Sequence, residues 1–138
     1  MTRVAVTEKF GVSAERLWQR MGTFASLGDW SPAVESYECD GETPGSIRVL
    51  HVGGGGVVTE RLVEMDNKGR SYTYTIEDSP LPVKNYRSTI RVQDHGAGSS
   101  TIHWSSEFEP DGAPEADAVG IVEGIYHSGL GALKAEFG

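Results

Sequence analysis

The sequence is short of positive charge, of cysteine and of long apolar stretches, and each shortage excludes a class of protein. The 138 residues include 12 Lys and Arg against 20 Asp and Glu, which gives a net charge of -8. Nucleic acids and anionic membranes both require a basic surface, so neither is an expected partner. The single thiol, Cys39, cannot form an intrachain disulfide. No apolar stretch approaches the ~20 residues that a membrane span needs.

Signals for export and for metal binding are missing as well. Residues 1–6 lack the apolar segment of a signal peptide, so we expect a cytoplasmic protein. The four histidines do not occur at the spacing of metal ligands, and the four glycines of residues 53–56 lack the Lys-Ser/Thr of a phosphate loop. We therefore predict neither a metal nor another cofactor. The length suits a single domain over residues 1–138.

What the sequence does contain is a series of strands. Alternating polar and apolar residues predict strands at residues 57–65, 71–77, 83–94 and 99–109. Each is joined to the next by a short connection with Gly or Pro, which is typical of antiparallel hairpins. Three further strands are predicted at residues 3–10, 34–39 and 46–52.

Hairpin pairing gives these strands one common apolar face. The turns place Glu60 near Ile76 and Ile90 near Trp104. Because side chains alternate with period two, the inward residues form a large, aromatic and almost uncharged surface. They are Val58, Glu60, Leu62, Tyr72, Tyr74, Ile76, Tyr86, Ser88, Ile90, Val92, Ile102, Trp104, Ser106 and Phe108. For the strand at residues 46–52 the inward set stays open, and is either Arg48, Leu50 and Val52 or Ile47, Val49 and His51.

Helical signals lie on either side of these strands. Ser13 is typical of an N-cap for a short helix at residues 14–21, and a second helical turn follows near residues 24–30. Residues 113–137 carry apolar side chains at helical spacing, which predicts one long helix. Only this helix is large enough to cover the apolar face. The predicted fold class is therefore α+β: a seven-stranded antiparallel sheet curved around a long C-terminal helix, with two short helices after the first strand.

Glu60 is the one carboxylate on the predicted apolar face. A carboxylate in such surroundings must be paired, hydrogen-bonded or protonated through a raised pKa. One interpretation makes it a polar anchor for a ligand hydroxyl or carbonyl, or a general base. The other makes it a structural carboxylate tied to Arg48 or to a tyrosine hydroxyl. Tyr74 and Tyr86 offer hydroxyls that could share a site with it.

Several short motifs occur in an order that is found in a known superfamily. They are Glu60-Arg61-Leu62, residues 80–86 with the sequence Pro-Leu-Pro-Val-Lys-Asn-Tyr, Trp104-Ser105, and residues 129–134 with the sequence Gly-Leu-Gly-Ala-Leu-Lys. Over nearly its whole length the chain resembles the helix-grip fold of the START/birch-pollen-allergen superfamily. The bacterial branch of that superfamily is called SRPBCC or polyketide cyclase/dehydrase-like. The resemblance implies a cavity between the sheet and the long helix.

The plant abscisic acid receptors are a distant branch with similar motifs. In that branch the residues that match Glu60, Tyr86 and Ser88 line the ligand cavity. Ser31 stands where the branch has a lysine that pairs with a carboxylate ligand, and residues 53–56 and 81–83 replace its two loop motifs. The resemblance therefore does not imply a carboxylate-bearing hormone as ligand, although a mouth made of two mobile loops remains expected.

The predicted cavity determines the candidate functions. Its predicted lining is Trp30, Glu60, Leu62, Tyr74, Ile76, Leu81, Val83, Tyr86, Ser88, Trp104, Ile121, Ile125 and Gly129. The first function is binding or carriage of a small apolar molecule such as a lipid, a polyketide or an aromatic metabolite. The second is a polyketide cyclase or dehydratase, with Glu60 as general base and Tyr74 or Tyr86 polarising the substrate oxygen. The third is a ligand-gated interaction module. We expect a monomer or a weak homodimer.

Overall fold

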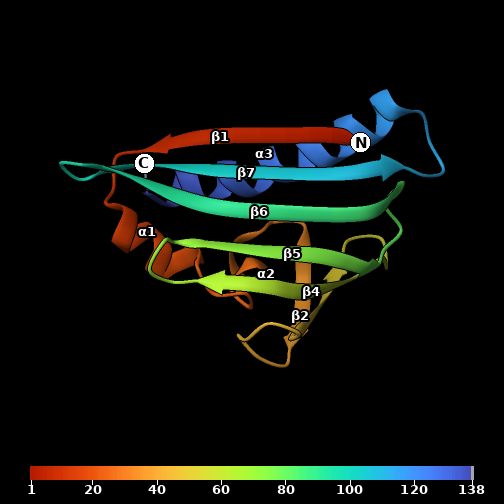
Figure 1. The fold of residues 1–138 in the computed structure, drawn as a ribbon, viewed down its shortest axis with the longest axis horizontal. Coiled ribbons are helices and arrows are strands. Elements are labelled where there is room, and N and C mark those ends of the chain that lie inside the picture. Colours follow the sequence, from red (N-terminus) through yellow and green to blue (C-terminus); the bar gives the residue numbers. More distant parts are fainter. Residues whose placement is uncertain (138) are drawn as a thin grey trace.

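A computed structural model describes residues 1–137 as a seven-stranded sheet with three helices (Figure 1). In chain order the elements are β1 (Thr2–Phe10), α1 (Ala14–Met21), α2 (Leu27–Trp30), β2 (Val34–Cys39), β3 (Ile47–Val52), β4 (Val57–Asp66), β5 (Ser71–Asp78), β6 (Val83–Gly96), β7 (Ser99–Pro110) and α3 (Glu115–Phe137). The predicted order of elements and the α+β class are confirmed. The second short helix begins at Leu27, later than the sequence pattern indicated.

The strands form one antiparallel sheet in the order β1-β7-β6-β5-β4-β3-β2. The predicted neighbours Glu60 and Ile76, and likewise Ile90 and Trp104, lie opposite one another. The sheet is strongly curved, and β2 runs at a steep angle to β7 in Figure 1. This curvature makes the inner face concave, which gives the helices a surface to fill.

The helices cover the concave face. α3 lies behind β1 and β7 in Figure 1 and packs against both strands. Its buried side chains are Ala118, Val122, Tyr126, Leu130 and Leu133, which recur at helical spacing as predicted. α1 packs against β6 and β7, and the predicted cap is present, since Ser13 Oγ accepts a hydrogen bond from the Arg16 amide. None of these helices has the length and hydropathy that crossing a membrane requires.

The structure decides the face that the sequence left open in β3. Arg48 and Leu50 point inward and are buried, whereas His51 points outward and lies 2.9 Å from a carboxylate oxygen of Glu38. Antiparallel pairing with β4 forces this choice, because Arg48 lies directly opposite Glu60 in the register. An arginine is thus placed inside the molecule beside the one inward carboxylate.

One prediction about α3 is wrong. Ile121 does not line an interior space, since 42% of it is exposed. The buried stripe of the helix is centred on Val122 and Tyr126, and neighbouring positions on a helix point about 100° apart. Among the glycines of α3, Gly129 faces the sheet, since an added Cβ there would meet Trp30 and Trp104. An added Cβ on Gly120, Gly124 or Gly131 would meet open space.

Candidate functional site

A cavity of about 190 Å³ lies on the concave face, between the sheet, the α2 segment and α3. We call it the inner cavity. Its walls are mostly apolar and come from Leu27, Ala33, Val34, Leu50, Val52, Val58, Pro80, Leu81, Trp104 and Ile125. Glu60, Ser31 and Tyr74 add the polar groups, and no Lys, Arg or His among residues 1–137 lines this space. An apolar hollow with few polar groups is the usual form of a small-molecule site.

The outer end of the inner cavity lies between two loops. Val52 and Val58 flank the glycine turn of residues 53–56, and Pro80 and Leu81 belong to the β5–β6 connection. Gly54 and Gly55 have φ angles of +85° and +84°, which other residues rarely adopt. An added Cβ on Gly56 would lie 3.4 Å from Pro80 Cγ, so the turn and the loop are close neighbours.

Glu60 lines this cavity, and its carboxylate forms an ion pair with Arg48, which does not line it. Arg48 Nε donates to Glu60 Oε1 at 2.7 Å, and the two side chains are 0% and 7% exposed. The contact follows from the sheet itself, because directly opposed residues on one face of an antiparallel pair have neighbouring side chains. The structural interpretation of Glu60 as an ion-paired carboxylate is therefore correct as geometry, and it coexists with a position on the cavity wall.

Arg48 is enclosed by aromatic side chains and backbone. Its Nη1 donates to the Phe24 carbonyl at 2.7 Å and to the Tyr72 hydroxyl at 3.2 Å. The guanidinium lies 4.2 Å from the Phe24 ring centroid and 4.7 Å from that of Tyr74, within the range of cation–π contacts. Its Nη2 is buried without a hydrogen-bond partner among residues 1–137. Arg48 is thus fully buried and does not line the inner cavity.

Burial and pairing act in opposite directions on the ionisation of the two partners. Burial raises the pKa of the Glu60 carboxyl, and Arg48 only partly offsets that rise. Burial lowers the pKa of Arg48, but Glu60 and the nearby tyrosines raise that pKa by more, so the guanidinium stays protonated. Burial also raises the pKa values of Tyr74 and Tyr86 well above their ordinary range, so both hydroxyls keep their protons at neutral pH.

The tyrosines belong to a buried network of hydroxyl groups next to the inner cavity. The Tyr86 hydroxyl is hydrogen-bonded to that of Tyr126 and lies 3.5 Å from that of Tyr74. Ser88 Oγ lies 3.1 Å from the Tyr126 hydroxyl, and Trp104 Nε1 donates to both Ser88 Oγ and the Tyr74 hydroxyl. The network links α3 to strands β5, β6 and β7, and it includes the hydroxyls of Tyr74 and Tyr86 that the enzyme hypothesis would use.

Gly129 lets two tryptophans pack closely against α3. A Cβ at position 129 would lie 2.8 Å from Trp30 Cζ3 and 3.2 Å from Trp104 Cζ3. The two indoles make an edge-to-face contact with ring centroids 5.7 Å apart, and Trp104 stacks on Tyr126 at 4.1 Å. The glycine therefore serves close packing of α3 against these rings.

The structure divides the predicted site residues into four groups. Glu60, Tyr74, Leu81, Trp104 and Ile125 line the inner cavity. Ile76, Leu81, Val83 and Tyr86 line a second space of about 400 Å³ under the β5–β6 loop, which we call the loop hollow. Trp30, Leu62, Ser88 and Gly129 are buried and line neither space. Ile121 is exposed.

Sequence reasoning missed Arg48 as a definite neighbour of Glu60 and missed Tyr126 altogether as part of the site. Both could have been found from spacing. Counting outward from the glycine turn brings Arg48 opposite Glu60, and Tyr126 lies in the predicted stripe of α3, one turn before Gly129 and Leu130. Among residues 1–137, no three His, Cys, Asp or Glu side chains come together in a way that could hold a metal ion.

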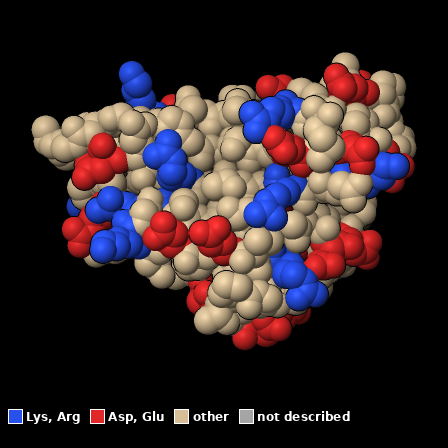
Figure 2. Space-filling view, in the orientation of Figure 1, with Lys and Arg blue, Asp and Glu red and all other residues tan. Residues whose placement is uncertain are grey.

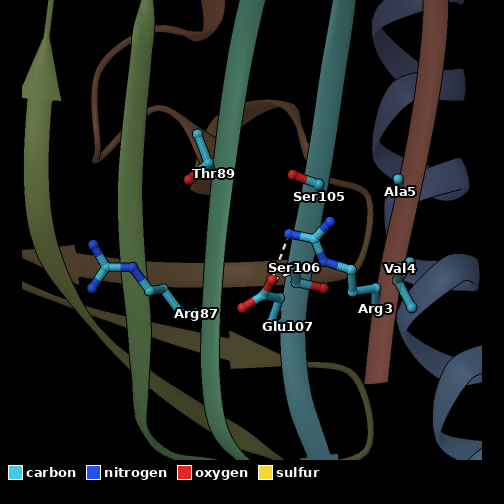
Figure 3. Close-up of a pocket in the computed structure, with 8 residues that line it drawn as sticks. All are labelled: Arg3, Val4, Ala5, Arg87, Thr89, Ser105, Ser106 and Glu107. Atoms are coloured by element: carbon cyan, nitrogen blue, oxygen red, sulfur yellow. Dashed lines mark hydrogen bonds and ion pairs between the residues drawn. The ribbon is translucent and has the colours of Figure 1, made fainter. Parts of the chain in front are cut away.

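The convex face of the sheet also has a groove, of about 210 Å³, but a very different one (Figure 3). Its charged lining residues Arg3, Glu107 and Arg87 come from β1, β7 and β6, and its small ones include Ala5 and Ser105. Arg3 Nε donates to Glu107 Oε1 at 2.7 Å. In Figure 2 acidic and basic side chains are interspersed over this face around an uncharged centre. The groove is shallow, polar and open to water.

The solved structures of other proteins agree with this architecture. XoxI from Bacillus cereus is 35% identical, with a TM-score of 0.93 over 99% of this chain and 96% of that one. An uncharacterised protein from Bacillus thuringiensis is 36% identical, with a TM-score of 0.92 and coverages of 99% and 98%. The Zhui aromatase/cyclase from a Streptomyces species is 20% identical, with a TM-score of 0.75 and coverages of 95% and 87%, and shows likeness of fold alone.

The whole chain also matches a known family. A search of curated proteins finds no match. The family model described as "Polyketide cyclase / dehydrase and lipid transport" matches residues 1–138. The helix-grip arrangement and the motifs around Glu60 and Tyr86 had predicted this relationship. The chain therefore belongs to the polyketide cyclase/dehydrase and lipid transport family.

Proposed function

We propose that the protein binds a small, largely apolar molecule in the inner cavity and holds it with Glu60. The observation that supports this most is the cavity itself, an apolar space on the concave face with one carboxylate in its wall. Core side chains normally pack without a void larger than a water molecule, so a space of about 190 Å³ in this position indicates a ligand site. The family's description, which includes lipid transport, agrees with a binding role.

The size of the cavity limits the ligand. A cavity of about 150 Å³ is large enough for a benzene ring. The inner cavity, at about 190 Å³, therefore suits a molecule with one ring or a short chain. Leu81 lines both the inner cavity and the loop hollow, so its displacement would join the two spaces. A longer lipid or polyketide would need that movement of the β5–β6 loop.

A second candidate function is catalysis of cyclisation or dehydration with Glu60 as general base. The observation that favours it is the burial of Glu60, which raises the pKa of this carboxyl toward the range useful in proton transfer. Tyr74 lines the same space and would polarise a substrate oxygen, whereas Tyr86 lies in the loop hollow. No contact among residues 1–137 favours the third prediction, a ligand-gated interaction module.

Native mass spectrometry of the protein purified from its own host tests the binding function. We expect one apolar molecule per chain, which extraction would then identify. Ile125→Trp fills the inner cavity from α3, so this variant should carry no ligand. Ile121→Trp is the matched control, since the same substitution one turn away is exposed and should keep the ligand. Equal retention by both variants, or an empty wild type that takes up no added apolar compound, would refute binding in this cavity.

The Glu60→Gln variant separates carriage from catalysis. In a carrier, Glu60→Gln weakens binding and there is no turnover to lose. In an enzyme, the amide cannot accept a proton, so turnover of the identified compound falls while binding is retained.

A further inference from the structure

We propose that the ligand is uncharged and donates a hydrogen bond from a hydroxyl or N–H group to Glu60, with Arg48 as the positioning residue that turns this carboxylate toward the inner cavity. The proposal rests on the proposed binding function and names the chemical class that the site selects. The reason is that Glu60 lines the cavity whereas its partner Arg48 does not.

Only one oxygen of the Glu60 carboxylate, Oε1, accepts a hydrogen bond from residues 1–137. Arg48 Nε donates to Oε1, and no other side-chain hydrogen bond from residues 1–137 involves the Glu60 carboxylate. Glu60 lines the inner cavity with the little surface it exposes. A carboxylate is an acceptor only, and a buried acceptor is stable when a donor faces it. A ligand that brings a hydroxyl or N–H to Oε2 would satisfy it.

The cation of the pair is hidden from the same space. Arg48 is fully buried and does not line the inner cavity, and its Nε and Nη1 are committed to Glu60, Phe24 and Tyr72. Since no Lys, Arg or His of the described part of the chain lines the cavity, an anionic ligand would meet a carboxylate and no positive group there. Carboxylates and phosphates are therefore excluded by the charge of the wall.

Arg48 also disfavours a positively charged ligand. The pair is already neutral as a whole, so an ammonium ion would bring an unbalanced charge into an apolar space.

The other polar groups of the cavity wall discriminate little between ligands. The Tyr74 hydroxyl is engaged by Trp104 Nε1, and the Ser31 hydroxyl makes no side-chain hydrogen bond among residues 1–137 and suits either a donor or an acceptor. Selection by charge thus falls to Glu60.

Four ring-sized probes test the proposal directly: phenol, toluene, benzoate and benzylammonium. Phenol and toluene have nearly the same shape and differ by a hydroxyl for a methyl group. We expect phenol to bind wild-type protein about tenfold more tightly than toluene at pH 7, because hydrogen bonds to a charged acceptor are the stronger kind. Benzoate and benzylammonium should bind more weakly than either. NMR titration of the indole N–H of Trp104, which lines the cavity, gives the dissociation constants.

Two variants attribute the preference to Glu60. Glu60→Gln should reduce the preference for phenol over toluene to less than about threefold, because a neutral amide is a weaker acceptor. Glu77→Gln is the control, since it removes a carboxylate that pairs with Arg61 on the convex face and should leave the preference unchanged. If Glu60→Gln does not fold, the double variant Arg48→Met with Glu60→Gln removes both charges and should show the same reduction.

The outcomes separate this inference from the proposed function. Toluene binding as tightly as phenol, or benzoate or benzylammonium binding most tightly, would overturn the inference and leave the binding function standing. An unchanged preference in Glu60→Gln would overturn it too. Failure of all four probes to bind would count against the inner cavity as a binding site and thus against both proposals.

Discussion

The two faces of the sheet carry similar ion pairs in opposite surroundings. On the concave face Arg48 and Glu60 lie directly opposite in the β3–β4 register, and on the convex face Arg3 and Glu107 lie directly opposite in the β1–β7 register. Both pairs have an Nε–Oε1 distance of 2.7 Å. The inner side chains are 0% and 7% exposed, whereas the outer ones are 78% and 43% exposed.

Strand register determines the geometry of an ion pair, while burial determines its energetic role. Water solvates each partner of an exposed pair, so losing one changes stability by less than about 1 kcal/mol. A buried partner has no such replacement, and losing its counterion leaves a charge in apolar surroundings. The same contact therefore contributes little to stability on the convex face, whereas its loss inside the molecule is strongly destabilising.

Arg48→Met should give the largest effect. Methionine keeps much of the side-chain volume but leaves the Glu60 carboxylate without its counterion, and we expect the free energy of unfolding to fall by about 3–5 kcal/mol at pH 7. Urea denaturation followed by circular dichroism measures the change. The loss should shrink at low pH, where Glu60 takes up a proton. A loss below about 1 kcal/mol would show that burial does not distinguish this pair from the outer one.

Gly129→Ala compares the two sides of α3. Its Cβ would press on Trp30 and Trp104, so overpacking of about 1–3 kcal/mol outweighs the gain of about 1 kcal/mol that alanine brings inside a helix. Gly124→Ala is the matched control on the exposed side, where a Cβ meets open space and only the gain applies. Thermal unfolding should rank Gly124→Ala above wild type and Gly129→Ala below it. The reverse order would mean that the indoles do not pack on Gly129.

The pH dependence of stability reports on Glu60. Burial raises the pKa of this carboxyl above its ordinary value of 4.5, so the folded state binds the proton more tightly than the unfolded chain does. Its contribution to stability is thus fully present at low pH and is lost as pH rises from 4.5 through the raised pKa. Relative to Glu60→Gln, which cannot titrate, the wild type should lose free energy of unfolding over that range. A relative gain would mean that Arg48 lowers this pKa below 4.5.

Arg3→Ala should give the smallest effect. Its pair with Glu107 lies on the convex face in full contact with water, so we expect the free energy of unfolding to change by less than about 1 kcal/mol. Raising the salt concentration should reduce even this difference, because exposed charges are screened. The same denaturation experiment that serves Arg48→Met measures it. A loss comparable to that of Arg48→Met would refute the distinction between the two faces.

Much of this architecture could be predicted because strands and helices have local periods. Alternation along β4, β5, β6 and β7 predicts Glu60, Tyr74 and Trp104 on the concave face, where they lie. The partition of that face into an inner cavity and a loop hollow could not be predicted. It depends on the positions of Leu81 and α3, and these positions are set by contacts between residues far apart in the chain.

Backbone geometry acts locally, so the order of residues is enough to predict which side chains alternate toward the core, which connections turn back, and that one carboxylate lies among aromatic side chains. Packing between distant elements was needed to bury Arg48 against Glu60, to turn Tyr126 and not Ile121 toward the sheet, and to keep Arg48 out of the cavity lining. The periodicity of a strand or helix identifies the residues that share one face. The side chains that this face contacts depend on how distant elements pack together.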